Sequence, residues 1–324
     1  MQIYEKTNTL PEIFRTRLAA IIPQPLLNQV MMSFVQPRPM SVRHNTLKAD
    51  AVDIQSQLKE ENINFKIVDW CPQALVFDGS SAQNVNQSAR ITDGRLYQQS
   101  LSSMFVSCAL DPKPRDKVLD LCAAPGSKSS HMAALMNNQG TLVCVEKVPQ
   151  RCYRLKSVLA LLGVKNAQVI CKDGRRFQPA KDGLFDKVLV DAPCSSEGRF
   201  HVDDEKSYAY WSLRKIKEMA QKQKGLLLQA GRCLKQDGEL IYATCTFAPE
   251  ENEAVVDWFL RKAENEFELL PVDCPFPTYP AVLEWGKKKF NPALKHCVRI
   301  LPDEMMDGFF IAKLRKTSTE RKPS

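Results

Sequence analysis

The sequence predicts an α/β protein with a mostly parallel sheet covered by helices on both faces, preceded by a small α+β subdomain. From residue 118 onward, short apolar runs typical of buried strands alternate with helical stretches, which is the pattern of a parallel sheet. The strands predicted in this way are 118–122, 141–146, 168–171, 187–191 and 239–244.

The first 95 residues show another pattern, which predicts the subdomain. Apolar spacing indicates two short helices between residues 10 and 34, interrupted near Pro23 and Pro25. An extended segment, an amphipathic helix and two strand-like runs follow, at 41–47, 49–60, 64–68 and 74–77. We therefore expect three parts, namely a subdomain at 1–95, a main domain at 96–316 and a disordered polar tail at 317–324.

The C-terminal third should complete the sheet. An apolar face on 213–234 that includes Leu213 predicts a long amphipathic helix, and Asp237-Gly238 predicts the turn into the strand at 239–244. Two late runs, 297–301 and 308–314, predict an antiparallel hairpin at the sheet edge.

Composition limits the class of protein. The chain has 324 residues, of which 44% are hydrophobic and 25% charged, as in ordinary globular proteins, and no window is apolar for long enough to span a bilayer. We expect no membrane role and, without a secretory pattern at the start, a cytoplasmic location. The net charge of +8 favours a polyanionic partner such as nucleic acid.

The cysteines form neither a disulfide framework nor a zinc pattern. There are eleven of them, an odd number, and no C-x-x-C pair occurs. The four histidines have no ligand spacing either, so we expect no metal.

A ligand loop is predicted after the strand at 118–122. Small residues there let the backbone approach a ligand beside the start of the next helix, at the carboxyl end of the strand. The loop has neither the glycines of a dinucleotide fingerprint nor those of a phosphate-binding P-loop. Its residues are Cys122, Ala123, Ala124, Pro125, Gly126, Ser127 and Lys128.

Three acidic residues follow successive predicted strands. Glu146 ends the second strand, Asp173 lies past the third and Asp191 ends the fourth. Such acids can accept hydrogen bonds from ribose hydroxyls and amino groups, so they fit a cationic cofactor without phosphate. Taken singly, each acid is better explained as a helix or turn cap, but three acids at successive strand ends favour a binding site.

Two thiols also fall at adjacent strand ends, Cys194 after the fourth strand and Cys245 after the fifth. Carbon-5 of cytosine attacks a methyl donor only after a thiolate has added to carbon-6, which is a role for a strand-end cysteine. A second acid–base group must then assist loss of the carbon-5 proton, and Cys194 is placed for that. Asp191 could bind the exocyclic amine and ring nitrogen N3.

These stretches resemble the Nol/Nop/Sun family of RNA cytosine-5 methyltransferases. The resemblance covers most of the chain and departs from the family at Ser196, where glycine is usual, and at His44, where an aliphatic residue is usual. The matching residues are 120–128 (DLCAAPGSK), 191–195 (DAPCS), 244–246 (TCT), Glu250-Glu251-Asn252, 307–310 (DGFF), 43–48 and 98–103.

The resemblance implies a Rossmann-like class I methyltransferase domain behind an RNA-contacting N-terminal subdomain. S-adenosyl-L-methionine would be bound by residues 122–128, Glu146, Asp173 and Asp191, with Arg151 as a further candidate. Cys245 would be the nucleophile, and Cys194 would assist product release.

The resemblance also indicates the partner. Enzymes with this N-terminal segment look most like bacterial enzymes that act on small-subunit ribosomal RNA, so we expect rRNA or a ribosomal subunit as substrate and a monomeric enzyme. Two alternatives stay open, a tRNA cytosine-5 methyltransferase and a non-catalytic RNA-binding or ribosome-assembly factor. The pair of thiols argues against the second of these, because a binding protein needs neither.

Overall fold

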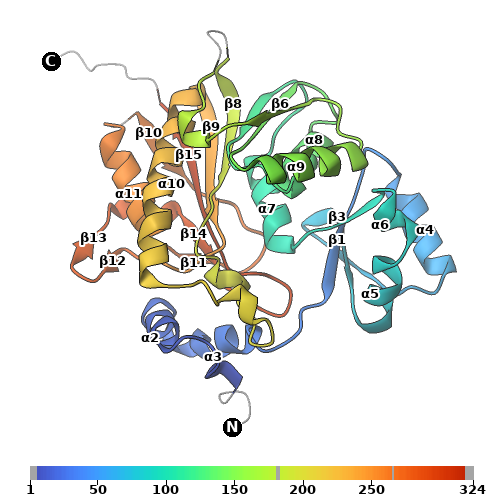
Figure 1. Cartoon of the computed structure of the whole chain (residues 1–324), viewed down its shortest axis with the longest axis horizontal. Coiled ribbons are helices and arrows are strands. Elements are labelled where there is room, and N and C mark those ends of the chain that lie inside the picture. Colours follow the sequence, from blue (N-terminus) through green and yellow to red (C-terminus); the bar gives the residue numbers. More distant parts are fainter. Residues whose placement is uncertain (1–5, 180–182, 265, 318–324) are drawn as a thin grey trace. The chain divides into compact units, whose positions relative to one another are not determined.

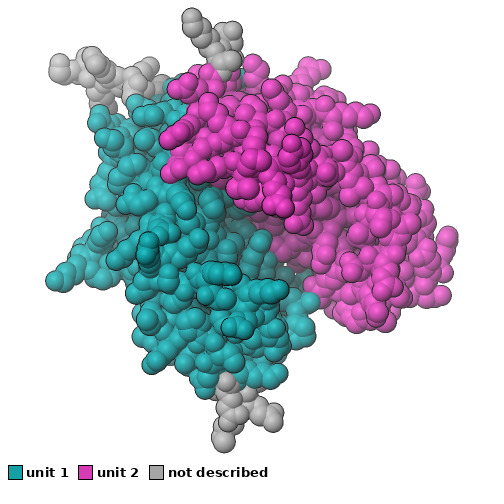
Figure 2. Space-filling view, viewed as in Figure 1, with its two compact units in different colours: residues 1–38, 190–324 teal, residues 39–189 magenta. Residues whose placement is uncertain are grey.

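The computed structural model describes residues 6–179, 183–264 and 266–317 and is shown in Figure 1. It consists of two compact units, which are coloured separately in Figure 2. We call residues 39–189 the central unit, and residues 1–38 with 190–324 the split unit. Apart from Thr317, the predicted tail lies outside the described residues.

The central unit holds two sheets. The antiparallel sheet has the order β2-β3-β1-β4, and the parallel strands follow the order β8-β5-β6-β7. Its strands are β1 (Met40–His44), β2 (Lys66–Val68), β3 (Cys71–Phe77), β4 (Leu96–Gln98), β5 (Lys117–Asp120), β6 (Thr141–Glu146), β7 (Ala167–Cys171) and β8 (Phe185–Asp191), whose last two residues belong to the split unit. Its helices are α4 (Ala51–Glu60), α5 (Gly79–Asn86), α6 (Ala89–Thr92), α7 (Leu101–Leu110), α8 (Ser127–Leu135), α9 (Pro149–Leu161) and the 3-10 helix η1 (Gly174–Arg176).

Local chemistry explains these elements. Asp50 caps the N-terminus of α4, because its side chain accepts a hydrogen bond from the N–H of Val52 at 2.8 Å. Strands β5, β6 and β8 each contain a buried apolar run, whereas β7 is only partly buried; helices α7, α8 and α9 pack in this unit against one another and against β6 and β7. In register, Asp120 lies opposite Cys144, and Glu146 lies opposite Cys171. The carboxyl ends of β5, β6 and β7 therefore share one edge.

The split unit combines helices with antiparallel strands. Strand β15 pairs with β9, β14 and β10, and β14 pairs with β11. Its strands are β9 (Leu234–Thr244), β10 (Phe267–Leu270), β11 (Tyr279–Pro280), β12 (Glu284–Trp285), β13 (Lys288–Lys289), β14 (Val298–Ile300) and β15 (Phe309–Lys316). Its helices are α2 (Glu12–Ile21), α3 (Gln24–Ser33), α10 (Leu213–Cys233), α11 (Glu253–Lys262) and the 3-10 helices η2 (Glu197–Arg199), η3 (Glu205–Ser207) and η4 (Pro292–His296).

Helices α2 and α3 have their core inside the split unit. Phe14 of α2 lies against Phe200, with ring centroids 4.8 Å apart, and Phe34 lies against Phe247 at 6.3 Å. The first 95 residues are thus distributed over both units.

Two details of the C-terminal third differ from expectation. Strand β9 begins at Leu234, directly after α10, so Asp237 lies inside the strand, with φ at +58°, rather than in a turn before it. Leu213, the first residue of α10, is 41% exposed rather than part of the buried face of the helix. The predicted pairing of the two late runs is confirmed, although β15 lies inside its sheet.

None of the described helices is both long enough and apolar enough to span a bilayer.

Candidate active site

Two thiols lie side by side in the split unit. The Sγ atoms of Cys194 and Cys245 are 3.4 Å apart, which is within hydrogen-bond distance for sulfur. Cys194 follows β8, and Cys245 comes directly after β9. The N–H of Ala192 donates to the carbonyl oxygen of Ala243 at 2.9 Å, which brings the two loops together. Asp191, the last residue of β8, is half-buried in the same unit.

A close backbone contact fixes the loop between the two thiols. The N–H of Gly198 donates to the carbonyl oxygen of Cys245 at 2.9 Å, and the N–H of Gly308 donates to the carbonyl oxygen of Gly198 at 3.3 Å. A Cβ atom at position 198 would lie 2.3 Å from the carbonyl oxygen of Gly308. Three segments far apart in the chain therefore meet here because position 198 has no side chain.

Ser196 adopts a left-handed backbone conformation, with φ at +61°. This conformation is uncommon for residues with a Cβ atom and is accessible to glycine. It gives a physical reason for the glycine that the resemblance expects at this position.

Glu251 stabilises the loop that carries Cys194 through hydrogen bonds. Its carboxylate accepts hydrogen bonds from the N–H of Ser195 at 3.0 Å and from Nε2 of Gln223 at 2.8 Å. Gln223 also donates to the carbonyl oxygen of Pro193 at 3.0 Å. Burial raises the pKa of Glu251 to about 8, although these hydrogen bonds act in the opposite direction.

Glu197 holds the Cys245 loop in a similar way. One oxygen accepts from Oγ1 of Thr246 at 2.9 Å and from the N–H of Phe247 at 3.0 Å. The other accepts from Nε1 of Trp211 at 2.8 Å. Burial raises the pKa of Glu197. The two buried glutamates thus position the loops on either side of the thiol pair.

The two thiols have different acidities. The pKa of Cys245 is lowered from 9.0 to about 6. The hydrogen bond from Cys194 contributes most to this shift and the guanidinium of Arg199 adds to it, while burial acts in the opposite direction. The same hydrogen bond raises the pKa of Cys194 well above its ordinary value. At neutral pH Cys245 is therefore the thiolate, and Cys194 is the thiol that donates to it.

The predicted ligand loop lies in the central unit, between β5 and α8. Asp120 stabilises the conformation of this loop. Its carboxylate accepts hydrogen bonds from the N–H of Cys122 at 3.2 Å and from Oγ of Ser129 at 2.7 Å. Gly126 has φ at +113°, a conformation that side chains strongly disfavour, and α8 starts directly after it. The peptide bond between Ala124 and Pro125 is cis.

Glu146 and Arg151 lie beside this loop. Glu146 ends β6 and is only 4% exposed; its carboxylate accepts from the N–H of Val148 at 2.9 Å and lies 3.1 Å from Nη1 of Arg151. Nη2 of Arg151 donates to the carbonyl oxygen of Ala124 at 2.7 Å. Arg151 thus connects the strand-end acid to the loop.

Asp173 follows β7 at the same sheet edge and also caps a helix. Its side chain accepts from the N–H of Arg175 at 3.1 Å, at the start of η1, and lies 3.3 Å from Nζ of Lys147. The hydrogen bonds from the Arg175 guanidinium lower the pKa of Asp173, so the carboxylate is ionised.

Two family descriptions match the chain. "16S rRNA methyltransferase RsmB/F" matches residues 107–315, and the ferredoxin-like domain of RsmF/B-like methyltransferases matches residues 10–84. The chain belongs to the RsmB/F family of RNA methyltransferases.

Two sequence relatives within this group have different named substrates. A tRNA (cytosine(49)-C(5))-methyltransferase of Pyrococcus abyssi is 37% identical over 282 residues, which cover 87% of this chain and 89% of the relative. A ribosomal RNA small subunit methyltransferase F of Shigella dysenteriae is 33% identical over 319 residues, which cover 97% of this chain but 64% of the relative. The chain thus spans less than two thirds of the length of the second relative.

A solved structure confirms the fold class. A methyltransferase homologue from Pyrococcus horikoshii superposes with a TM-score of 0.81 at 30% identity, covering 97% of this chain and 99% of the other. The α/β fold with a central parallel sheet is therefore the Rossmann-like methyltransferase fold that the resemblance implied.

The cofactor of this RsmB/F enzyme is S-adenosyl-L-methionine, which supplies the methyl group. The residues of the central unit fit it. The carboxylates of Glu146 and Asp173 offer acceptors to hydroxyl and amino groups, and they lie at the sheet edge from which the loop 122–128 starts. Their negative charge suits a sulfonium ligand that carries no phosphate.

Three aromatic residues, Trp70, Tyr208 and Trp285, make contacts within the protein. Nε1 of Trp285 donates to Glu250 at 3.0 Å. Tyr208 lies against Phe200, and Trp70 lies against Phe105, with ring centroids 6.0 and 5.7 Å apart.

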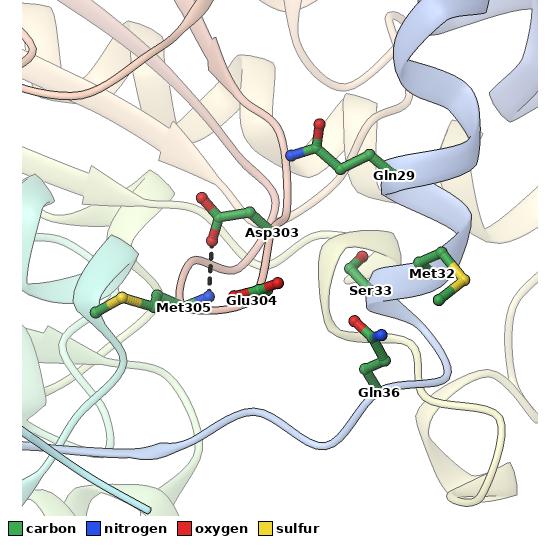
Figure 3. Close-up of a pocket in the computed structure, with 7 residues that line it drawn as sticks. All are labelled: Gln29, Met32, Ser33, Gln36, Asp303, Glu304 and Met305. Carbon is green, nitrogen blue, oxygen red and sulfur yellow. Dashed lines mark hydrogen bonds between the residues drawn. The ribbon is translucent and has the colours of Figure 1, made fainter.

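A pocket in the split unit contains none of the predicted site residues. Figure 3 shows it between helix α3 and the loop before β15. Its lining residues are Gln29, Met32, Ser33, Gln36, Asp303, Glu304 and Met305. It offers two carboxylates and no cysteine, so it provides neither the nucleophile nor a phosphate site.

Sequence reasoning missed several residues that shape the thiol site. Arg199, Glu197 and Gln223 were not singled out, and Glu251 and Gly308 were noted only as parts of family motifs. The motif 307–310 could have indicated the contact with Gly198, because a glycine beside aromatic residues permits close backbone approach.

Substitution of Gly198 by Ala should damage the site. The new Cβ atom must displace the carbonyl of Gly308, and displacement of a catalytic loop by about 1 Å can lower kcat/KM about 100-fold. Methyl incorporation into RNA measures this. Gly286→Ala is the control, since a Cβ atom there meets nothing within 4 Å. Equal kcat/KM values for both variants would contradict the role of the contact.

Proposed function

We propose that the chain methylates carbon-5 of a cytosine in small-subunit ribosomal RNA through a covalent adduct with Cys245. The observation that carries this proposal is the acidified thiol of Cys245 lying 3.4 Å from a second, protonated thiol. The family supplies the RNA substrate class and the methyl donor.

In the proposed reaction the Cys245 thiolate adds to carbon-6, forming an S–C bond and placing an electron pair at carbon-5. Carbon-5 takes the methyl group as the sulfonium–methyl bond breaks. A general base of the protein then removes the carbon-5 proton. The S–C6 bond breaks and the 5,6 double bond re-forms, which releases Cys245 as a thiolate.

Cys194 and Asp191 have complementary roles in this proposal. The Cys194 thiol donates to the Cys245 sulfur in the resting state. After Cys245 has bonded to carbon-6, Cys194 releases its proton to solvent, and its sulfur then accepts the carbon-5 proton. The Asp191 carboxyl group accepts a hydrogen bond from the cytosine amine and, when protonated, donates one to N3, which stabilises the adduct. The base must be unpaired for either group to reach it.

Basic side chains of the split unit suit the RNA backbone. Burial lowers the pKa of Lys224, and the positive charges of Lys288 and Arg261 lower it as well, so both cations lie within electrostatic range of Lys224. Clustered cations of this kind bind phosphates through release of counterions. We propose that this cluster and the subdomain at 1–95 contact RNA, and that the enzyme acts as a cytoplasmic monomer on a ribosomal subunit.

A tRNA substrate is the second candidate, favoured by the 37% identity to a tRNA enzyme over 89% of that protein. Purified protein should be incubated with labelled S-adenosylmethionine and with small ribosomal subunits, protein-free rRNA or tRNA. Bisulfite sequencing then locates the methylated cytosine. Label in subunits or rRNA supports the proposal, label in tRNA alone supports the second candidate, and label in none contradicts both.

Activity should depend on ionisation of Cys245. The group is active as a thiolate, and its pKa is lowered to about 6, so kcat/KM should fall as the pH drops through about 6. Arg199→Met removes a cation that favours the thiolate, so the falling limb should move to higher pH. The pH dependence of kcat/KM and of Cys245 alkylation, followed by mass spectrometry, measures both effects.

Arg232→Met, on α10, is the matched control and should leave the limb in place. An unchanged midpoint in Arg199→Met would show that this guanidinium does not act on Cys245.

A further inference from the structure

Three potential metal ligands converge in the central unit, away from the thiols of the proposed reaction. Sγ of Cys71, Sγ of Cys108 and a ring nitrogen of His131 all lie within 4.8 Å of one another. They come from three different elements, namely β3, α7 and α8.

The imidazole of His131 has no partner of its own. The residue is 1% exposed, and neither ring nitrogen has a hydrogen-bond partner among the described residues. Leaving two buried polar atoms unsatisfied is unfavourable, and a bound water or ion is one way in which such atoms are satisfied. A neutral imidazole in this position offers a ring nitrogen lone pair to an ion.

Arg43 adds a second unsatisfied group next to the cluster. Its Nε donates to Gln99 at 3.0 Å and its Nη2 to Ser130 at 2.9 Å, while the buried Nη1 has no partner in the described part of the chain. The guanidinium interacts electrostatically with both Cys71 and Cys108. A thiolate at either position would provide an acceptor for Nη1.

We propose that Cys71, Cys108 and His131 bind a divalent ion of the zinc type. Two thiolates and an imidazole are preferred zinc ligands, and a tetrahedral ion accepts them with one position left for water. Two thiolates cancel the charge of the ion, so its binding adds no net positive charge beside Arg43. Cys108 is half-buried, which places the open side of the site at this residue.

The ion would act as a structural connection within the central unit. It would join β3 to α7 and to α8, the helix that begins where the loop 122–128 ends. Binding of an ion to the folded chain alone stabilises that state. This role is separate from methyl transfer and does not depend on the identity of the RNA substrate.

The test is metal binding by the whole protein. Chelator-treated protein is titrated with Zn²⁺ and, separately, with Co²⁺, whose thiolate charge-transfer and ligand-field bands report tetrahedral sulfur coordination. We expect about one equivalent per chain and a rise in Tm of about 5 °C on loading. Cys108→Ser and His131→Gln should lose the cobalt bands and the rise in Tm.

Two controls identify the ligands. Cys274→Ser replaces a cysteine that is also half-buried, and Cys194→Ala/Cys245→Ala removes the other close thiol pair; both should bind one equivalent. Circular dichroism shows whether each variant is folded, and the wild-type titration stands even if a variant is not. Absence of binding in the wild type, a Cys71–Cys108 disulfide in its place, or loss of binding only in the Cys194/Cys245 variant would overturn the proposal.

Discussion

Replacement of Cys245 by Ala should abolish methylation of RNA. Without the sulfur, no bond to carbon-6 forms and carbon-5 stays too weak a nucleophile, so kcat should fall by about 10⁴-fold or more. Incorporation of labelled methyl groups measures the loss, and denaturing gels should show no covalent protein–RNA species.

Two comparisons make this result specific. Cys233→Ala removes another buried thiol, on α10, and should retain activity. Binding of S-adenosylmethionine to the Cys245 variant, measured by calorimetry, should be unchanged, because Cys245 is not among the residues assigned to the cofactor and all of these except Asp191 lie in the other unit. Substantial turnover by Cys245→Ala would rule out the covalent route.

Replacement of Cys194 by Ala should trap the reaction part-way. The adduct forms through Cys245, but the group that assists loss of the carbon-5 proton is missing, so elimination slows by about 10²- to 10⁴-fold. A band of covalently linked protein and RNA should therefore accumulate under denaturing conditions. Because Cys194 also donates to the Cys245 sulfur, the pKa of Cys245 should rise in this variant, and the adduct should form faster at higher pH.

The double variant Cys194→Ala/Cys245→Ala is the matched control and should give no band. If the Cys194 variant shows no adduct while the wild type is active, the assigned role of Cys194 is wrong.

The sequence predicted the sheet well where strands are buried on both faces. The run at 141–146 is strand β6 to the residue, since continuous apolar residues there have no alternative periodicity. Prediction was wrong at the junction of α10 and β9, where Asp237-Gly238 has the composition of a turn. Asp237 has a left-handed φ of +58° within β9, and β9 pairs with β15 from Glu239 onward, a tertiary contact that no local pattern contains.

The two thiols proposed to react could be predicted to lie close together because strand-end positions follow from the order of the elements. The contacts of Arg199, Glu197 and Glu251 with the two loops could not be predicted, because they join distant segments. The cluster of Cys71, Cys108 and His131 was missed for the same reason. Its members are far apart in the chain and have none of the short ligand spacings by which metal sites are recognised.

The contact between Gly198 and Gly308 has a consequence for protein synthesis. Both cysteines of the reactive pair leave the ribosome well before Gly308, yet the backbone bond that joins Gly308 to the Cys194–Gly198 loop cannot form until Gly308 has been translated. A nascent or truncated chain ending before this glycine would contain the sulfur atoms without the full set of contacts that orders them. Complete assembly of the proposed reactive centre is thereby delayed until Gly308 has been translated.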